Sequence, residues 1–126
     1  MTIKRVLCPE RLRQIPAQFS WVDHRLVRAR YIERCDPPAA ALYLFLVTVA
    51  DIQGLSYYAD ATLVRSLSMA PARLHRARDD LVRNGLIAYQ RPLYQVLALE
   101  GSPRERGADE RDARIALLQD AIGRAP

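Results

Sequence analysis

Arginines are the side chains of this sequence with the clearest capacity for chemistry. Lys4 is the sole lysine among 19 basic residues, and a guanidinium can hold a phosphate or a guanine edge with two parallel hydrogen bonds, which an ammonium cannot do. Arg73 and Arg76 are three residues apart, so on a helix they project from one face. A GC-rich bacterial genome would also enrich arginine, and both explanations stay open.

The positive charge is concentrated in two parts of the chain. Residues 1–35 carry eight Lys or Arg against three Asp or Glu, and residues 59–99 carry six against three. The net charge of the 126 residues is +5. Nucleic acid or another acidic surface is therefore a plausible partner, with plain basic solubility as the alternative.

Motifs of common enzyme classes are missing from the sequence. It contains no Gly-x-x-x-x-Gly-Lys phosphate loop, no Gly-x-Ser-x-Gly elbow and no His-Glu-x-x-His. His24 and His75 are far apart, and Asp79 and Asp80 diverge by about 100 degrees on a helix, so they form no carboxylate pair. We therefore expect neither enzymatic activity, nor a cofactor, nor a metal site.

The two cysteines and the apolar segments indicate in which cellular compartment the protein is expected. Cys8 and Cys35 are too few for a disulfide scaffold or a four-cysteine zinc site, so we expect reduced thiols. The N-terminus has no apolar leader, and the longest apolar run, residues 39–50, is too short to cross a bilayer. The prediction is a cytoplasmic protein that does not insert into membranes.

Residues 1–36 are predicted to form a basic N-terminal extension packed on the core. Residues 19–22 could form a short strand, and a helix is expected over 23–32 with Asp23 as its N-cap. Four apolar residues of this part are expected to pack on the main domain: Trp21, Leu26, Val27 and Tyr31.

Residues 37–100 are predicted to form the main domain. Pro37 and Pro38 suit the first turn of a helix over 39–51, whose apolar residues cover nearly its whole circumference and indicate burial on most sides. Gly54 ends this helix. Residues 55–58 are then a short extended stretch of the kind that pairs with a hairpin.

Two further helices and a hairpin follow. Asp60 has the position of an N-cap for a helix with Leu63, Val64 and Leu67 on one side, and residues 68–70 form a turn. Pro71 begins the next helix, and Gly85 ends it in a left-handed conformation. Its inward face is marked by Leu74, Ala77 and Leu81.

Residues 86–89 and 93–99 are two β runs joined by 90–92, a hairpin with Arg91 at its tip. The fold class predicted from this order is mainly α with a small β-hairpin wing (α+β), a winged helix-turn-helix. Residues 101–126 are predicted to be a polar linker followed by a short helix over 112–122. That helix could cover the domain, pair with a second copy or fray; one face carries Ile115, Leu118 and Ile122.

Four stretches of the chain resemble a known family. Residues 41–46, 50–56, 60–67 and 78–87 are similar to winged-helix domains of bacterial replication initiators and primosomal proteins, and to small helix-turn-helix proteins of plasmids and insertion sequences. These stretches lie within the unit of residues 39–99, which is about half of the chain. It implies a transcriptional regulator, or a replication or transposition accessory factor, of a bacterial mobile element.

The family resemblance also implies the position of a DNA site. In such proteins the second helix of the motif enters the major groove, which places residues 70–73, 75 and 76 at the groove. Arg73 and Arg76 are then expected to contact bases or phosphates, Arg83 the backbone, and Arg91 a phosphate or the minor groove. The full expected set is Arg65, Arg73, His75, Arg76, Arg83 and Arg91, with double-stranded DNA as partner and a homodimer as the assembly.

Some residues favour other interpretations. The tip sequence Ala70-Pro71-Ala72 offers few hydrogen bonds, which favours a non-enzymatic adaptor or inhibitor that docks on a replication, transposition or defence complex. Arg78 stands where winged-helix motifs usually have an apolar residue, which suggests a salt bridge with Asp79, Asp60 or the N-terminal arm, or a partner surface. The tyrosines could pack in the core and hairpin or stack on unpaired bases; they are Tyr57, Tyr58, Tyr89 and Tyr94.

Overall fold

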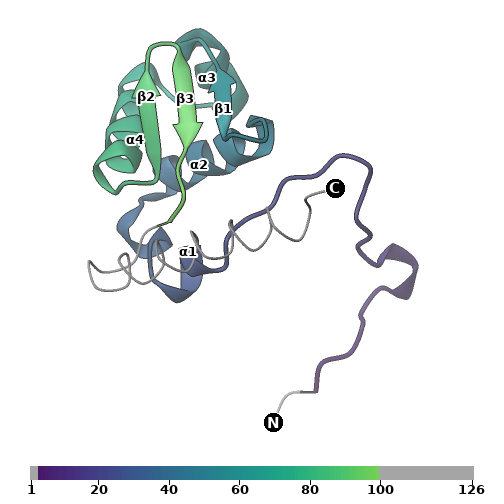
Figure 1. The fold of residues 1–126 in the computed structure, drawn as a ribbon. Coiled ribbons are helices and arrows are strands. Elements are labelled where there is room, and N and C mark those ends of the chain that lie inside the picture. The colour runs from purple at the N-terminus through teal and green to yellow at the C-terminus, as the bar shows by residue number, and fades with distance from the viewer. Residues whose placement is uncertain (1–2, 100–126) are drawn as a thin grey trace, which may run out of the picture.

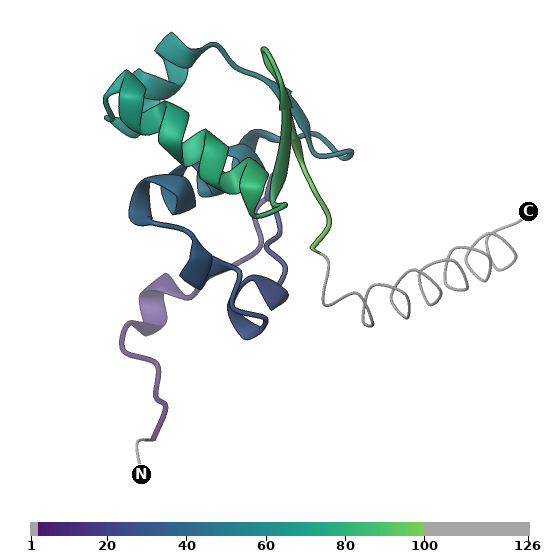
Figure 2. The same ribbon diagram turned by 90° about the vertical axis from the view of Figure 1, so that its left-hand side faces the viewer.

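The computed structural model describes residues 3–99, which form an α+β fold (Figure 1). A three-stranded antiparallel sheet is covered on one face by helices, as the turned view shows (Figure 2). The α-helices are α1 (Arg25–Arg28), α2 (Pro37–Val49), α3 (Asp60–Leu67) and α4 (Pro71–Arg83). The strands are β1 (Leu55–Tyr57), β2 (Ile87–Gln90) and β3 (Leu93–Val96), and the 3-10 turns are Pro9–Arg11 and Ile32–Arg34.

The sheet has the order β1-β3-β2. The hairpin strands β2 and β3 pair with Tyr89 opposite Tyr94, and β1 pairs with β3 so that Ser56 lies opposite the same tyrosine. The prediction that residues 55–58 pair with the hairpin is thus confirmed for β1. Tyr94 is fully buried at the centre of the sheet, because it has a strand on each side and helices over its face.

The hydrophobic core lies between the helices and this sheet. Helix α2 contributes Leu42 and Leu46, both fully buried, and α4 contributes the predicted inward face of Leu74, Ala77 and Leu81. Helix α2 is not covered on every side, however. Leu44 of this helix is 62% exposed. The prediction that the helix is buried on most sides is therefore confirmed only for its inward face.

Local signals place both ends of α4 where the sequence predicts them. Pro71 is the first residue of α4, where the missing backbone N–H leaves no helical hydrogen bond unmade. Gly85 follows the helix with φ of +72°, a left-handed conformation that glycine adopts without steric cost. The amide of Leu86 then donates to the carbonyl of Leu81, which closes the end of the helix.

The N-terminal part differs from its prediction. Residues 19–22 form no strand, and α1 covers Arg25–Arg28 rather than 23–32. The Asp23 carboxylate accepts from the Arg25 amide, but Arg30 then takes a left-handed φ of +65°, which ends the helix before Tyr31 turns into the core. Leu26 and Tyr31 are buried as expected, whereas Val27 and Trp21 are exposed, Trp21 to 76%.

The start of α3 also differs. The N-cap residue is Ala59, which makes no side-chain cap, and Asp60 is the first helical residue. The predicted capping role of Asp60 is therefore wrong, because its carboxylate binds side chains of α4 instead. No helix within residues 3–99 is long and apolar enough to cross a membrane. The helix predicted over 112–122 lies outside the described residues.

Candidate nucleic-acid interface

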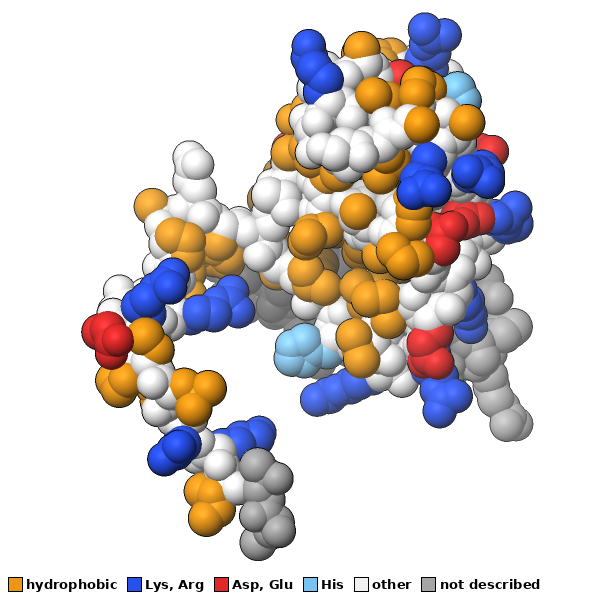
Figure 3. All heavy atoms as spheres, turned by 180° about the vertical axis from the view of Figure 1, so that it is seen from behind, with side chains coloured by type: hydrophobic (Ala, Val, Ile, Leu, Met, Phe, Trp, Pro, Cys, Tyr) orange, Lys and Arg blue, Asp and Glu red, His pale blue; other side chains and the backbone are white. Residues whose placement is uncertain are grey.

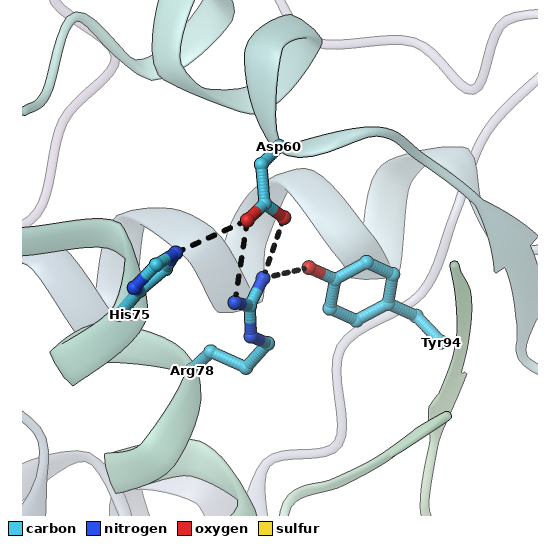
Figure 4. Close-up of polar contacts among 4 residues, drawn as sticks. All are labelled: Asp60, His75, Arg78 and Tyr94. Atoms are coloured by element: carbon cyan, nitrogen blue, oxygen red, sulfur yellow. Dashed lines mark hydrogen bonds and ion pairs between the residues drawn. The ribbon is translucent and has the colours of Figure 1, made fainter. Parts of the chain in front are cut away.

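Helices α3 and α4 are joined by a polar cluster of Asp60, His75, Arg78 and Tyr94 (Figure 4). Nη1 of Arg78 donates to Oδ1 of Asp60 at 2.8 Å and to the Tyr94 hydroxyl at 2.9 Å. Nε2 of His75 lies 3.1 Å from Oδ2 of Asp60. The guanidinium of Arg78 also stacks over the Tyr89 ring, 4.3 Å from its centroid.

The two charged partners Arg78 and Asp60 differ in burial, and their hydrogen bonds keep both of them charged. The Arg78 side chain is 10% exposed and that of Asp60 is 41% exposed. Hydrogen bonds from Arg78, and then from His75, lower the pKa of the Asp60 carboxyl against the effect of its partial burial. Burial disfavours the charge of Arg78, but hydrogen bonds with Asp60 and Tyr94 outweigh it and raise the Arg78 pKa. Both groups are therefore ionised at neutral pH.

The cluster fixes how the N-terminal half of α4 is presented. Arg78 connects α4 to the first residue of α3 and to the central strand β3, so the three elements are held in one arrangement. The suggested salt bridge from Arg78 to Asp60 is confirmed, and it forms without Asp79. His75, predicted to face a groove, also turns to Asp60.

Arg73 and Arg76 lie together on the exposed side of α4. Both line a hollow of about 580 Å³ between the start of α2, the turn after α3 and the first turns of α4. Asp36 also lines this hollow, but its carboxylate accepts from the Ala39 amide and caps α2. No acidic group within residues 3–99 forms an ion pair with either arginine.

The other predicted arginines do not join this hollow. Arg65 is exposed in the last turn of α3, and Arg91 is exposed at the turn between β2 and β3. Neither has an ion-pair partner among residues 3–99. Arg83 lies at the far end of α4 and pairs with Asp80, so part of its charge is already compensated.

The tip of α4 is exposed and apolar. Ala70, Pro71 and Ala72 are all exposed and bring no side-chain hydrogen-bonding group, so the first polar side chain of the helix is that of Arg73. Further along the helix Asp79 is exposed as well. The positive charge of α4 is therefore strongest in its first two turns.

The tyrosines act mainly as packing residues. The ring of Tyr94 lies 4.6 Å from that of Tyr89, and Tyr58 meets Phe45 edge to face at 5.0 Å. Tyr94 is buried, so it offers no face for an unpaired base. Tyr57 alone of the four is largely exposed, on the outer edge of β1. A row of stacking platforms for single-stranded nucleic acid is not present in this sheet.

Residues suited to hold a metal ion are not clustered in the described part of the chain, where no three His, Cys, Asp or Glu come together. Cys8 and Cys35 are free thiols, Cys8 exposed and Cys35 half-buried. Comparison with protein-family models, curated proteins and solved structures finds no match to this chain.

Proposed function

We propose that the chain is a winged-helix protein that binds double-stranded DNA through the first turns of α4. The order α2, β1, α3, α4, β2, β3 and the sheet order β1-β3-β2 support a winged helix, with the β2–β3 hairpin as the wing. Helix α4 would enter the major groove, and Arg91 on the wing would reach an adjacent phosphate.

The observation that carries this proposal is that some basic side chains of α4 form ion pairs within the fold, whereas others do not. Asp60 is occupied by Arg78 and His75, and Asp80 by Arg83, whereas Arg73 and Arg76 keep exposed guanidinium groups without an ion-pair partner within residues 3–99. A fixed helix with two uncompensated arginines in its first turns suits phosphate or guanine contacts.

The side chains in the first turns of α4 favour contacts with DNA phosphates over contacts that recognise a base sequence. The tip of α4 has only alanine and proline before Arg73, so few side chains can report on base identity. Phosphate contacts then supply most of the binding free energy, and affinity should fall steeply with salt. The resemblance of residues 41–46, 50–56, 60–67 and 78–87 supports a role as a transcriptional regulator, or as a replication or transposition accessory factor, of a bacterial mobile element.

Binding to duplex DNA tests this function directly. Fluorescence anisotropy should be recorded with the DNA upstream of the protein's own gene and with a random duplex, over a series of salt concentrations. Selective binding to the upstream DNA would identify a regulator or initiator, and equal, salt-sensitive binding would identify backbone contacts. Absence of binding to either duplex at low salt would refute the proposal.

A second function is favoured by the N-terminal arm. Residues 3–21 run away from the end of the molecule that holds α3 and the hairpin turn (Figures 1 and 2), and they carry large exposed hydrophobic side chains. These are Ile3, Val6, Leu7, Leu12, Ile15, Phe19 and Trp21. Such an arm suits a protein-binding adaptor that docks on a nucleoprotein complex. Removal of residues 1–18 should leave DNA affinity intact if the arm serves a protein partner only.

A further inference from the structure

An apolar groove lies along the outer side of α2. It has a volume of about 330 Å³ and no charged side chain in its lining, and its walls come from α1, the 3-10 turn after it and α2. Figure 3, which views the molecule from behind the sheet, shows hydrophobic side chains gathered across the middle of this face. Leu44 and Val22, both in the groove, are 62% and 47% exposed. An uncovered apolar surface of this kind indicates a binding site.

The described chain ends beside this groove. Leu99 is buried in a second hollow that shares Tyr43 and Val47 with the groove. The sequence continues for 27 residues, 100–126, of which 100–111 are mostly polar. A twelve-residue polar linker, as the sequence predicts for 100–111, typically spans roughly 20 Å, which is ample to reach a neighbouring site. A segment beyond such a linker would therefore be at high effective concentration near the groove.

The segment after the linker matches the groove in length and chemistry. Residues 112–122 are predicted to be helical, with Ile115, Leu118 and Ile122 on one face. From the first to the last of these is seven residues, or about 10 Å along a helix. The groove follows α2 from Ala40 to Val47, which are also seven residues apart and therefore separated by the same distance along the helix axis. Two stripes of equal length can thus pack against each other.

We propose that residues 112–122 of the same chain dock as a helix in the groove on α2, with Ile115 and Leu118 against Leu44 and Val47. The short tether favours the chain's own segment over a second copy, because intramolecular binding needs no encounter between molecules. Docking there would cover the apolar face at the end of the molecule away from the hairpin turn. The inference is independent of DNA binding.

Cys35 lines the groove and so reports on its occupancy. The rate of alkylation of Cys35 should be measured by mass spectrometry in the full chain, with the exposed Cys8 of the arm as internal reference. The test variant is Ile115→Glu with Leu118→Glu. The matched control is Ala113→Glu with Ala116→Glu, which adds the same charge on the opposite side of the predicted helix.

Docking predicts that Cys35 is alkylated about tenfold more slowly in the wild type and the control than in the test variant, while Cys8 reacts equally in all three. The protection should not change with protein concentration. Equal Cys35 rates in all three proteins would overturn the proposal. Protection that appears only at high concentration, together with a dimer in sedimentation, would overturn it in favour of a second copy.

The other side of the contact offers a second measurement. Leu44→Glu alters a largely exposed residue, so the variant should fold, but it places a charge in the groove. Trypsin cleavage after Arg114 should then become about tenfold faster than in the wild type, because the docked helix is released. An unchanged cleavage rate after Arg114 would show that the segment does not occupy the groove.

Discussion

Arg78 of α4 donates a 2.8 Å hydrogen bond to Asp60 at the start of α3, and the two partners differ sharply in exposure. The arginine side chain is 10% exposed and the aspartate side chain 41% exposed. A cation inside the fold is thus compensated by an anion at its surface. This asymmetry means that the two residues depend on each other unequally, since water can replace Arg78 around Asp60 but cannot reach Arg78 as readily.

Removal of each partner should therefore have a different effect on stability. Asp60→Ala leaves Arg78 buried with only Tyr94 and the Tyr89 ring, and should cost about 2–4 kcal/mol of unfolding free energy. Arg78→Met leaves an aspartate that water and His75 can still solvate, but it also removes the donor to the buried Tyr94 hydroxyl, and it should cost about 1–2 kcal/mol. Urea unfolding of both variants and of the double variant measures the difference. An equal cost for the two single variants would contradict the asymmetry.

The same pair predicts a pH dependence. Hydrogen bonds from Arg78 and His75 lower the pKa of the Asp60 carboxyl in the folded state. The stabilisation is therefore complete above the ordinary aspartate pKa of about 4 and is lost as the pH falls through the lower folded value. The stability difference between the wild type and Asp60→Asn should shrink as the pH falls from 5 to 3. Asp79→Asn, on the exposed side of α4, controls for the loss of one negative charge. A difference that grows on acidification would exclude this assignment.

Two glycines with positive φ should respond differently to alanine. Gly54 has φ of +85°, and a Cβ there would lie 2.6 Å from the carbonyl oxygen of Val96 in β3. Gly85 has φ of +72° with open space around it. Gly85→Ala should cost about 1 kcal/mol for the left-handed backbone alone, and Gly54→Ala at least about 2 kcal/mol because β3 must also move. Thermal unfolding compares them, and a cost for Gly85→Ala equal to or above that for Gly54→Ala would contradict the close approach.

The sequence predicts best where the determinants are local. Pro71, Gly85 and the spacing of Leu74, Ala77 and Leu81 define α4 within the chain itself, and the structure places its start and inward face there. The pairing of residues 55–57 with the hairpin was also predicted, because a short extended stretch satisfies its backbone hydrogen bonds by joining a neighbouring strand.

Predictions that depended on tertiary context were less accurate. Nothing near Trp21 in the sequence shows that the body of the protein leaves it uncovered, and nothing near Arg30 shows that the chain turns left-handed to bury Tyr31. Asp60 and His75 have the local pattern of a cap and a surface residue. Their contact with each other and with the inward Arg78 becomes visible only once α3 and α4 are packed. Arg78 at a core position was the one available signal.

The most direct test of DNA binding by α4 is the affinity of Arg73→Ala/Arg76→Ala for duplex DNA, measured by anisotropy over a salt series. Its control is Arg28→Ala/Arg34→Ala, which removes the same charge from exposed positions outside α4. We predict that the α4 variant binds at least about tenfold more weakly at low salt, with the salt slope reduced by about two, and that the control stays near the wild type. Wild-type affinity in the α4 variant, with its fold intact by circular dichroism, would contradict the account.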